Sequence, residues 1–178
     1  MHLPAHRRPW TRAAVLGGGA HVLYELLAGV GMPFAALAGP VPAAAWWAGS
    51  TVVGVREAAR RRASWDPAFA VVDGLYLSAV VAHLAGWPRI RPWLPWLAEC
   101  EGMRGPVVHP YNVVLYASGV AAVGGLLENR GGLAGALVVP VVVPWLVGAQ
   151  HREYRRLLAQ ARWRPGWWNR RLRRRAAG

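Results

Sequence analysis

Apolar runs long enough to cross a membrane, separated by groups of arginines, constrain this chain more than any other feature. A helix rises ~1.5 Å per residue, so about 20 apolar residues cross a ~30 Å hydrocarbon layer. The apolar segments are residues 13–38, 41–55, 67–87, 107–127 and 133–149. The second is short, and the last is marginal because it contains two prolines. We therefore predict an all-α, polytopic integral membrane helical bundle with four or five transmembrane helices.

The basic residues, 21 in number and all arginine, give a net charge of +13. They lie at the ends of the apolar runs, which is typical of membrane segments rather than of a nucleic-acid-binding surface. We predict no nucleic-acid partner. The arginine groups are Arg7, Arg8 and Arg12; Arg56 and residues 60–62; and ten arginines between residues 152 and 175.

The sequence divides at residue 150. Residues 1–150 are predicted to form the transmembrane bundle, and residues 151–178 a basic, Trp-rich tail that is either interfacial or disordered. Five crossings would place this tail opposite the first arginine group, so the positive-inside rule favours four crossings, whereas apolar length allows five. Arginine without lysine, together with abundant Ala, Gly, Pro and Val, is typical of GC-rich coding. We predict a multi-pass protein of the bacterial inner (plasma) membrane.

The first segment carries ionisable groups inside its apolar run. A carboxylate near the middle of a span costs roughly 2.5–3.5 kcal/mol on insertion scales, so Glu25 should face the bundle interior. At 100° per residue, His21, Tyr24 and Glu25 fall within an arc of ~100°. They form one polar stripe.

Two later segments carry similar stripes. In the third, Asp73, Tyr76 and His83 fall within an arc of ~80°. In the fourth, Asn112 and Tyr116 lie one helical turn apart. Converging stripes would form a polar pocket inside an apolar bundle. His83 lies close to the end of its segment, where an interfacial position is the simpler interpretation.

The loop between the third and fourth segments, residues 88–106, is too irregular to span and is predicted to lie at a surface. Its Glu99-Cys100-Glu101 run is interpreted as part of that surface loop. Cys100 is the single cysteine, which excludes an internal disulfide.

The preferred chemistry for the polar set is proton transfer. If the first and third segments run parallel and the fourth antiparallel, Glu25, Asp73 and Tyr116 could meet at similar depth. A carboxyl held protonated by burial could then protonate an apolar substrate, and aromatic faces could stabilise a cation. The predicted catalytic residues are His21, Glu25, Asp73 and Tyr76, and the predicted substrate-binding residues are Tyr24, Asn112, Tyr116 and Trp145.

Metal ligation is the second chemistry that these residues allow. Two histidines, His21 and His83, with the carboxylates Glu25 and Asp73, would suit iron or zinc. However, Asp73 and His83 are separated by ~15 Å of helix rise, so one ion cannot reach both. We therefore predict no metal and no cofactor.

These residues indicate an isomerase- or cyclase-like enzyme that acts on a lipid or isoprenoid substrate. The predicted partners are membrane lipids and an apolar small molecule, with a homo-oligomer or another membrane protein as further partners. The alternatives are a small proton-coupled transporter or binding protein for apolar cations, and a structural or assembly subunit whose polar residues only join helices.

Some of these residues also resemble a known family. The His21–Glu25 pair, the Asp66, Phe69 and Asp73 set, the stretch LLENRGG at 126–132, and Trp145 are similar to motifs of the emopamil-binding protein group. This group includes sterol double-bond isomerases and sigma-2-receptor-like relatives. The resemblance covers about residues 19–151 and implies that His21, Glu25 and Asp73 handle a proton beneath Trp145. Val142 departs from the pattern, because the family has an Asn there.

Overall fold

A computed structural model describes residues 8–60 and 62–177, and 79% of the chain is helical. Arg7 and Arg61 of the basic groups lie outside the described residues. The long helices are α1 (Pro9–Ala28), α3 (Pro40–Ala59), α4 (Asp66–Gly86), α5 (Val108–Glu128) and α6 (Gly132–Trp163). The short ones are α2 (Ala35–Ala38), α7 (Arg170–Ala176), and the 3₁₀ turns η1 (Ala63–Trp65), η2 (Gly105–Val107) and η3 (Trp167–Asn169).

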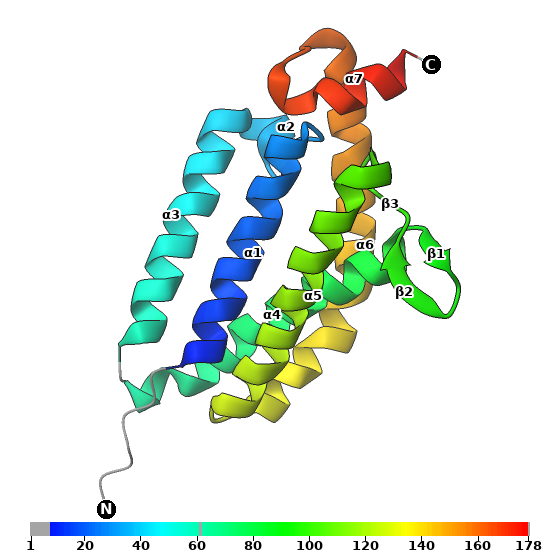
Figure 1. Cartoon of the computed structure of the whole chain (residues 1–178). Helices are drawn as coiled ribbons and strands as arrows, with labels where there is room; N and C mark the ends of the chain where they lie inside the picture. Colours follow the sequence, from blue (N-terminus) through cyan, green and yellow to red (C-terminus); the bar gives the residue numbers. More distant parts are fainter. Residues whose placement is uncertain (1–7, 61, 178) are drawn as a thin grey trace, which may run out of the picture.

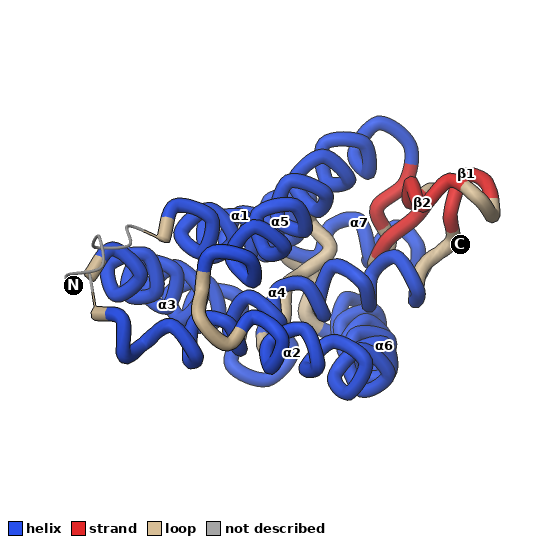
Figure 2. Tube along the Cα trace, turned by 90° about the horizontal axis from the view of Figure 1, so that it is seen from below, coloured by secondary structure: helices blue, strands red, loops and turns tan. Residues whose placement is uncertain are grey.

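Two antiparallel hairpins lie between α4 and α5. β1 (Arg89–Arg91) pairs with β2 (Leu94–Leu97), and β3 (Glu99–Cys100) pairs with β4 (Met103–Arg104). The expectation of an all-α chain is therefore corrected to a mostly helical one. Prolines in this stretch disfavour a helix, and Gly102, at φ +91°, supplies the second hairpin's turn. Figures 1 and 2 show the first hairpin projecting from one edge of the bundle.

Helix α1 packs between three other helices because three consecutive glycines face different neighbours. A Cβ atom on Gly17 would lie 2.4 Å from the Ser118 hydroxyl of α5, and one on Gly18 would lie 2.2 Å from the Tyr76 ring of α4. A Cβ on Gly19 would meet a side chain of α3 at 2.4 Å. A larger residue at any of these positions would have to displace a neighbouring side chain, so the glycines allow α1 to sit close to all three helices.

The contacts of α1 fix the helix directions. Thr11, near its start, donates a hydrogen bond of 2.8 Å to Asp73 near the start of α4. Glu25, near the end of α1, lies 3.9 Å from His83 near the end of α4. Helices α1 and α4 therefore run parallel. Tyr111, at the start of α5, reaches Glu25, so α5 runs antiparallel to both.

Helix α6 crosses α4 at very close range and continues far beyond the crossing. A Cβ on Gly74 would lie 2.1 Å from the backbone oxygen of Gly135, so the two helix backbones touch there. Pro140 and Pro144 lie inside α6, yet the helix remains continuous over 32 residues. The helix passes through residue 150, so the boundary predicted there between the bundle and the tail falls inside α6.

The chain after α6 folds back onto the bundle. The Gly31 amide donates to the Trp168 carbonyl (2.9 Å), and the Arg171 amide donates to the Gly29 carbonyl (2.9 Å). Trp168 and Leu172 are buried, as are Leu157 and Ala161 of α6. Residues 164–177 thus form a folded cap over the end of α1, rather than a disordered tail.

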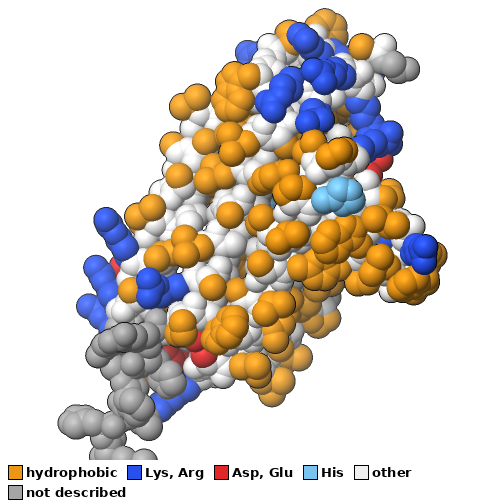
Figure 3. All heavy atoms as spheres, viewed as in Figure 1, with side chains coloured by type: hydrophobic (Ala, Val, Ile, Leu, Met, Phe, Trp, Pro, Cys, Tyr) orange, Lys and Arg blue, Asp and Glu red, His pale blue; other side chains and the backbone are white. Residues whose placement is uncertain are grey.

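The outer surface of the bundle is strongly apolar. On the face shown in Figure 3, hydrophobic side chains cover the middle of the molecule, and arginines gather toward its two ends. Among residues 8–60 and 62–177, three helical stretches are long and apolar enough to cross a membrane: Ala63–Gly86, Gly105–Glu128 and Gly132–Trp163. The fold is thus a helical bundle with candidate membrane spans.

Candidate functional site

Four side chains from three helices meet at the end of the bundle nearest to α7. His21 and Glu25 lie one turn apart on α1, and His21 Nε2 is 3.0 Å from Glu25 Oε1. The Tyr111 hydroxyl of α5 donates to the same Glu25 oxygen (2.8 Å) and lies 3.0 Å from His21 Nε2. The ring of His83 packs edge-on against that of His21, with centroids 4.7 Å apart. All four side chains are buried.

The proton position on His83 follows from its contacts. Its Nδ1 lies 2.7 Å from the Ala79 carbonyl, which can only accept, so Nδ1 carries the hydrogen. Nε2 therefore presents a lone pair toward Glu25. Neither His83 Nε2 nor Glu25 Oε2 has a hydrogen-bond partner within the described residues, although both atoms are buried. Two residues with an unsatisfied buried acceptor thus line the same space.

Glu101 closes this space from the second hairpin. It occupies the turn between β3 and β4 at φ +50°, and its Oε1 lies 4.0 Å from His83 Nε2. Burial raises the pKa of Glu101 well above its ordinary value, and the nearby carboxyls of Glu25 and Glu153 raise it further. The surface position expected for Glu101 is corrected, because the hairpin folds inward over the bundle end.

A cavity of about 470 Å³ opens from these polar groups. His21, Glu25, His83 and Glu101 lie on one part of its wall. The rest is mainly apolar, with Arg152, Glu153 and Arg156 among its polar members. The apolar lining includes Val22, Met32, Phe34, Leu37, Trp47, Trp145, Leu146, Ala149 and Leu157. Such a cavity suits a largely apolar molecule with its reactive part against the polar groups.

Of the four predicted substrate-binding residues, Trp145 lines the cavity and the other three make structural contacts. The Tyr24 hydroxyl donates to the Val107 carbonyl (2.8 Å). Asn112 is fully buried and bonds both backbone groups of Leu97, which ties β2 to α5. Tyr116 bonds the Pro95 carbonyl and stacks on Trp96 of the same hairpin. These three residues hold the hairpin region in place.

The predicted meeting of Glu25 with Asp73 is wrong. Asp73 Oδ2 accepts hydrogen bonds from Thr11 (2.8 Å) and Asn129 (2.9 Å) at the other end of the bundle. Tyr76, also predicted to be catalytic, packs against Gly18 between the two ends. Neither side chain lines the cavity.

Arg8 extends the Asp73 network. It forms a buried ion pair with Asp66 at 2.5 Å and donates to Asn129 at 3.1 Å. Its guanidinium also reaches the backbone oxygens of Arg60 and Arg62. This network joins α1, α4, α5 and the connection after α3. Its role is therefore structural.

Sequence reasoning missed Tyr111 and placed His83 and Glu101 at surfaces. Asn112 and Tyr116 lie on one face of α5. Tyr111 is adjacent to Asn112 in the sequence and therefore lies about 100° around the helix, on a different face. The available signal was the spacing of His83 from the start of its helix, because it matches the spacing of Glu25 on the parallel α1.

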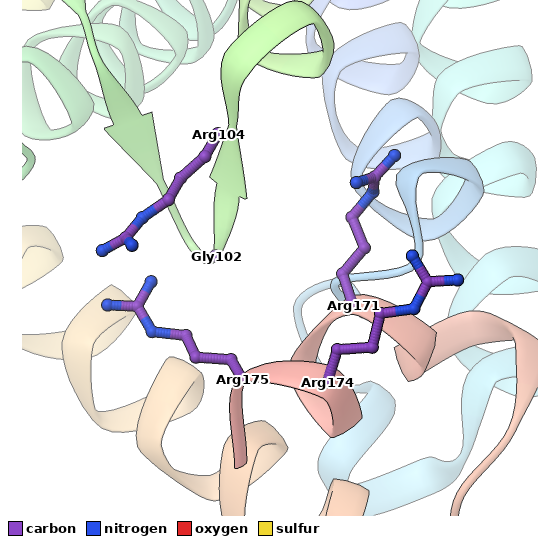
Figure 4. A pocket seen from close by; sticks show the side chains of 5 residues that line it. All are labelled: Gly102, Arg104, Arg171, Arg174 and Arg175. Carbon is purple, nitrogen blue, oxygen red and sulfur yellow. The ribbon is translucent and has the colours of Figure 1, made fainter. Parts of the chain in front are cut away.

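A second pocket, of about 310 Å³, lies between the second hairpin and α7. Arg104, Arg171, Arg174 and Arg175 line it around Gly102. Figure 4 shows Arg104 and Arg175 extending to one side of the pocket, and Arg171 and Arg174 extending to the other. Glu99 pairs with both Arg104 and Arg175. The four guanidinium groups therefore keep an excess of positive charge, which suits an anionic group.

Comparisons with family models, curated proteins and solved structures find no match to this chain. The fold and the cavity define a mostly helical protein with candidate membrane spans and a polar cluster that faces an apolar cavity. The resemblance to the emopamil-binding protein group stays a prediction.

Proposed function

We propose that this chain is a multi-pass protein of the bacterial plasma membrane that carries out proton-transfer chemistry, isomerisation or cyclisation, on a lipid or isoprenoid substrate. The observation that carries the proposal is the position of Glu25. Its buried carboxyl has one oxygen held by Tyr111 and the other unpartnered within the described residues, beside a mainly apolar cavity.

In this proposal all five long helices of the described chain cross the membrane. Helices α1 and α3 are each 20 residues long, enough to cross, and α1 packs along the candidate spans α4 and α5. Arginines flank both ends of the bundle, as expected for residues at the headgroup level. The end that carries α7 has more arginines, so we expect it to face the cytoplasm.

The cavity suits proton transfer because it pairs ionisable groups with an apolar surround. Tyr111 donates to one oxygen of Glu25, Oε1, which leaves Oε2 to exchange a proton with a carbon of the substrate. Glu101, on the hairpin, is the second carboxyl and takes the role expected of Asp73. In a double-bond isomerisation, one alkene carbon gains a proton, the other becomes a cation, and the carbon beyond it loses a proton, so the double bond moves by one position and no oxidant is needed. Trp47 and Trp145 supply aromatic faces for a transient cation.

The geometry favours an enzyme over a proton-coupled transporter. A transporter needs a proton pathway that reaches both sides of the membrane. Here the cavity lies near the α7 end, and Asp73 at the other end is packed among Thr11, Asn129 and Gly125. The two buried carboxyls therefore do not form one relay.

The direct test is deuterium exchange. The purified protein in detergent is incubated in deuterated water with isoprenoid and sterol lipids, and mass spectrometry follows deuterium entering carbon positions. We expect incorporation by the wild type and a loss of about 100-fold or more in Glu25→Gln, as general acid–base catalysis contributes about that much. Asp73→Asn, checked for folding, should retain exchange. Equal exchange by wild type and Glu25→Gln would overturn the proposal.

A further inference from the structure

We infer that His21, Glu25 and His83 bind one divalent transition-metal ion, of the zinc or iron class. One ligand atom from each residue lies within 4.8 Å of the other two. Atoms that bind one ion at ~2.0–2.2 Å are themselves separated by roughly 3–4 Å. The His83 Nε2 to Glu25 Oε1 distance of 3.9 Å is too long for a hydrogen bond, but it suits two ligands of the same ion.

The hydrogen bond from His83 to Ala79 orients the imidazole as a ligand. Metal-binding histidines commonly donate their second ring nitrogen to a carbonyl or carboxylate, which fixes the tautomer and the ring orientation. His83 Nδ1 makes this contact at 2.7 Å with a carbonyl of its own helix. The Nε2 lone pair is thereby aimed at Glu25 before any ion arrives.

The charges near the cluster also favour a cation. Glu25 Oε2 and His83 Nε2 are buried acceptors that lack a partner among the described residues. Glu101 brings a second carboxyl to 4.0 Å from His83 Nε2. With the His21 proton on Nδ1, all three ligand residues present lone pairs to one point. A divalent ion there would give His83 Nε2 a partner and balance the negative charge of the two carboxylates.

The donor types narrow the class of ion. Two imidazoles and a carboxylate suit zinc or iron, whereas soft ions such as Cu⁺ prefer thiolate and thioether ligands. The nearby thiol of Cys100 contacts the Tyr111 hydroxyl at 3.6 Å and does not join the cluster. Three protein ligands leave open positions toward the cavity for water or a substrate oxygen.

This inference goes beyond the proposed function, because it identifies a metal and concerns binding rather than reaction. An ion bound by Glu25 Oε1, His21 and His83 leaves Glu25 Oε2 and the Glu101 carboxyl to exchange protons beside it. Metal binding is measured without substrate, so its failure is distinguishable from that of the proposed reaction. Protein that exchanges deuterium but binds no ion would contradict the inference alone.

The experiment uses the full chain in detergent after chelator treatment. Co²⁺, a spectroscopic probe for zinc and iron sites, is added while visible absorption is recorded, and Zn²⁺ is then added in competition. We expect one ion per chain, and affinities at least tenfold lower in His21→Ala and His83→Ala. His109→Ala removes an exposed histidine of α5 and should bind as the wild type does.

A second measurement covers the case in which the histidine variants fold poorly. Zn²⁺ should raise the melting midpoint of the wild type and of His109→Ala, but not that of the near-isosteric Glu25→Gln, because binding to the folded state stabilises it. The inference is overturned if the wild type binds no ion. Equal affinity in His83→Ala, equal stabilisation of Glu25→Gln, or an equal loss in His109→Ala would overturn it as well.

Discussion

Glu25 and Asp73, two fully buried carboxyls, belong to separate polar networks at opposite ends of the parallel helices α1 and α4. Asp73 bonds Thr11, which precedes Glu25 by fourteen residues, ~21 Å along α1. One network lies on one part of the cavity wall, and the other joins helices.

The Arg8–Asp66 ion pair should be a major contributor to stability. Both side chains are 1% exposed, so Asp66→Asn leaves a buried guanidinium without its counter-charge. We expect a loss of about 3–5 kcal/mol in the free energy of unfolding, measured by thermal or denaturant unfolding in detergent. The partly exposed pair of Glu57 and Arg60 is the control, and Glu57→Gln should cost less than about 1 kcal/mol. Equal costs would contradict this assignment.

Two glycine substitutions should have opposite effects. A Cβ at Gly74 would lie 2.1 Å from a backbone oxygen of α6, which cannot move aside as a side chain can. Gly74→Ala should therefore lower stability by about 1–3 kcal/mol, as overpacking does. Gly49 in α3 has no atom within 4 Å of such a Cβ, so Gly49→Ala should be neutral or stabilise by up to about 1 kcal/mol. Melting midpoints of both variants test this contrast.

Glu99 should make the stability of the cap, residues 164–177, dependent on pH. Burial alone would raise its pKa, but hydrogen bonds and charges from Arg175 and Arg104 outweigh burial and lower it. The ionised form is therefore favoured by folding, so this stabilisation is present above the unfolded pKa of about 4.3 and is lost as pH falls through the lower folded value.

The variant Glu99→Gln should thus melt about 2–4 °C lower than the wild type at pH 7, for a loss of about 1 kcal/mol. The difference should shrink as the pH falls below about 4. A difference between wild type and variant that stays constant from pH 7 down to pH 3 would show that the ion pairs do not carry the effect.

The second pocket, which lies between the second hairpin and α7 and is lined by arginines, should bind the headgroups of anionic lipids. Arg171 and Arg174 line it, and neither pairs with a carboxylate among the described residues. The double change of Arg171 and Arg174 to Gln should reduce retention of phosphatidylglycerol, measured by native mass spectrometry, while phosphatidylcholine retention stays low. The matched control changes Arg89 and Arg91 of the first hairpin to Gln. If inorganic phosphate displaces the lipid fully, the pocket recognises phosphate alone.

Helical periodicity was sufficient to predict part of the site. His21 and Glu25, four residues apart, were expected on one face, and their side chains are in contact. The level of each residue along the bundle was harder to predict, because it depends on where its helix begins. Glu25 lies sixteen residues after Pro9 and His83 lies seventeen residues after Asp66, so these two residues share a level in parallel helices. Segment ends judged from hydropathy alone paired Glu25 with Asp73 instead.

Other contacts depend on tertiary structure that no local pattern records. Glu101 lies in a polar turn, which normally indicates a surface position, and its side chain is only 13% exposed because the second hairpin folds over the bundle end. Leu172 lies in an arginine-rich stretch, yet it is fully buried against the rest of the chain. The third and fourth apolar segments correspond closely to α4 and α5, since hydropathy and length determine them directly. The first segment extends ten residues beyond α1, and α6 continues fourteen residues beyond the last segment.

The central claim is that the cavity beside Glu25 holds an apolar molecule, and native mass spectrometry of the protein purified from membranes tests it most directly. The wild type should carry a bound lipid or isoprenoid. Ala149→Trp, which places an indole in the cavity wall, should lose it, whereas Leu133→Trp at an exposed position of the same helix should keep it. A wild type without bound apolar molecules, or equal retention by the two tryptophan variants, would contradict the account.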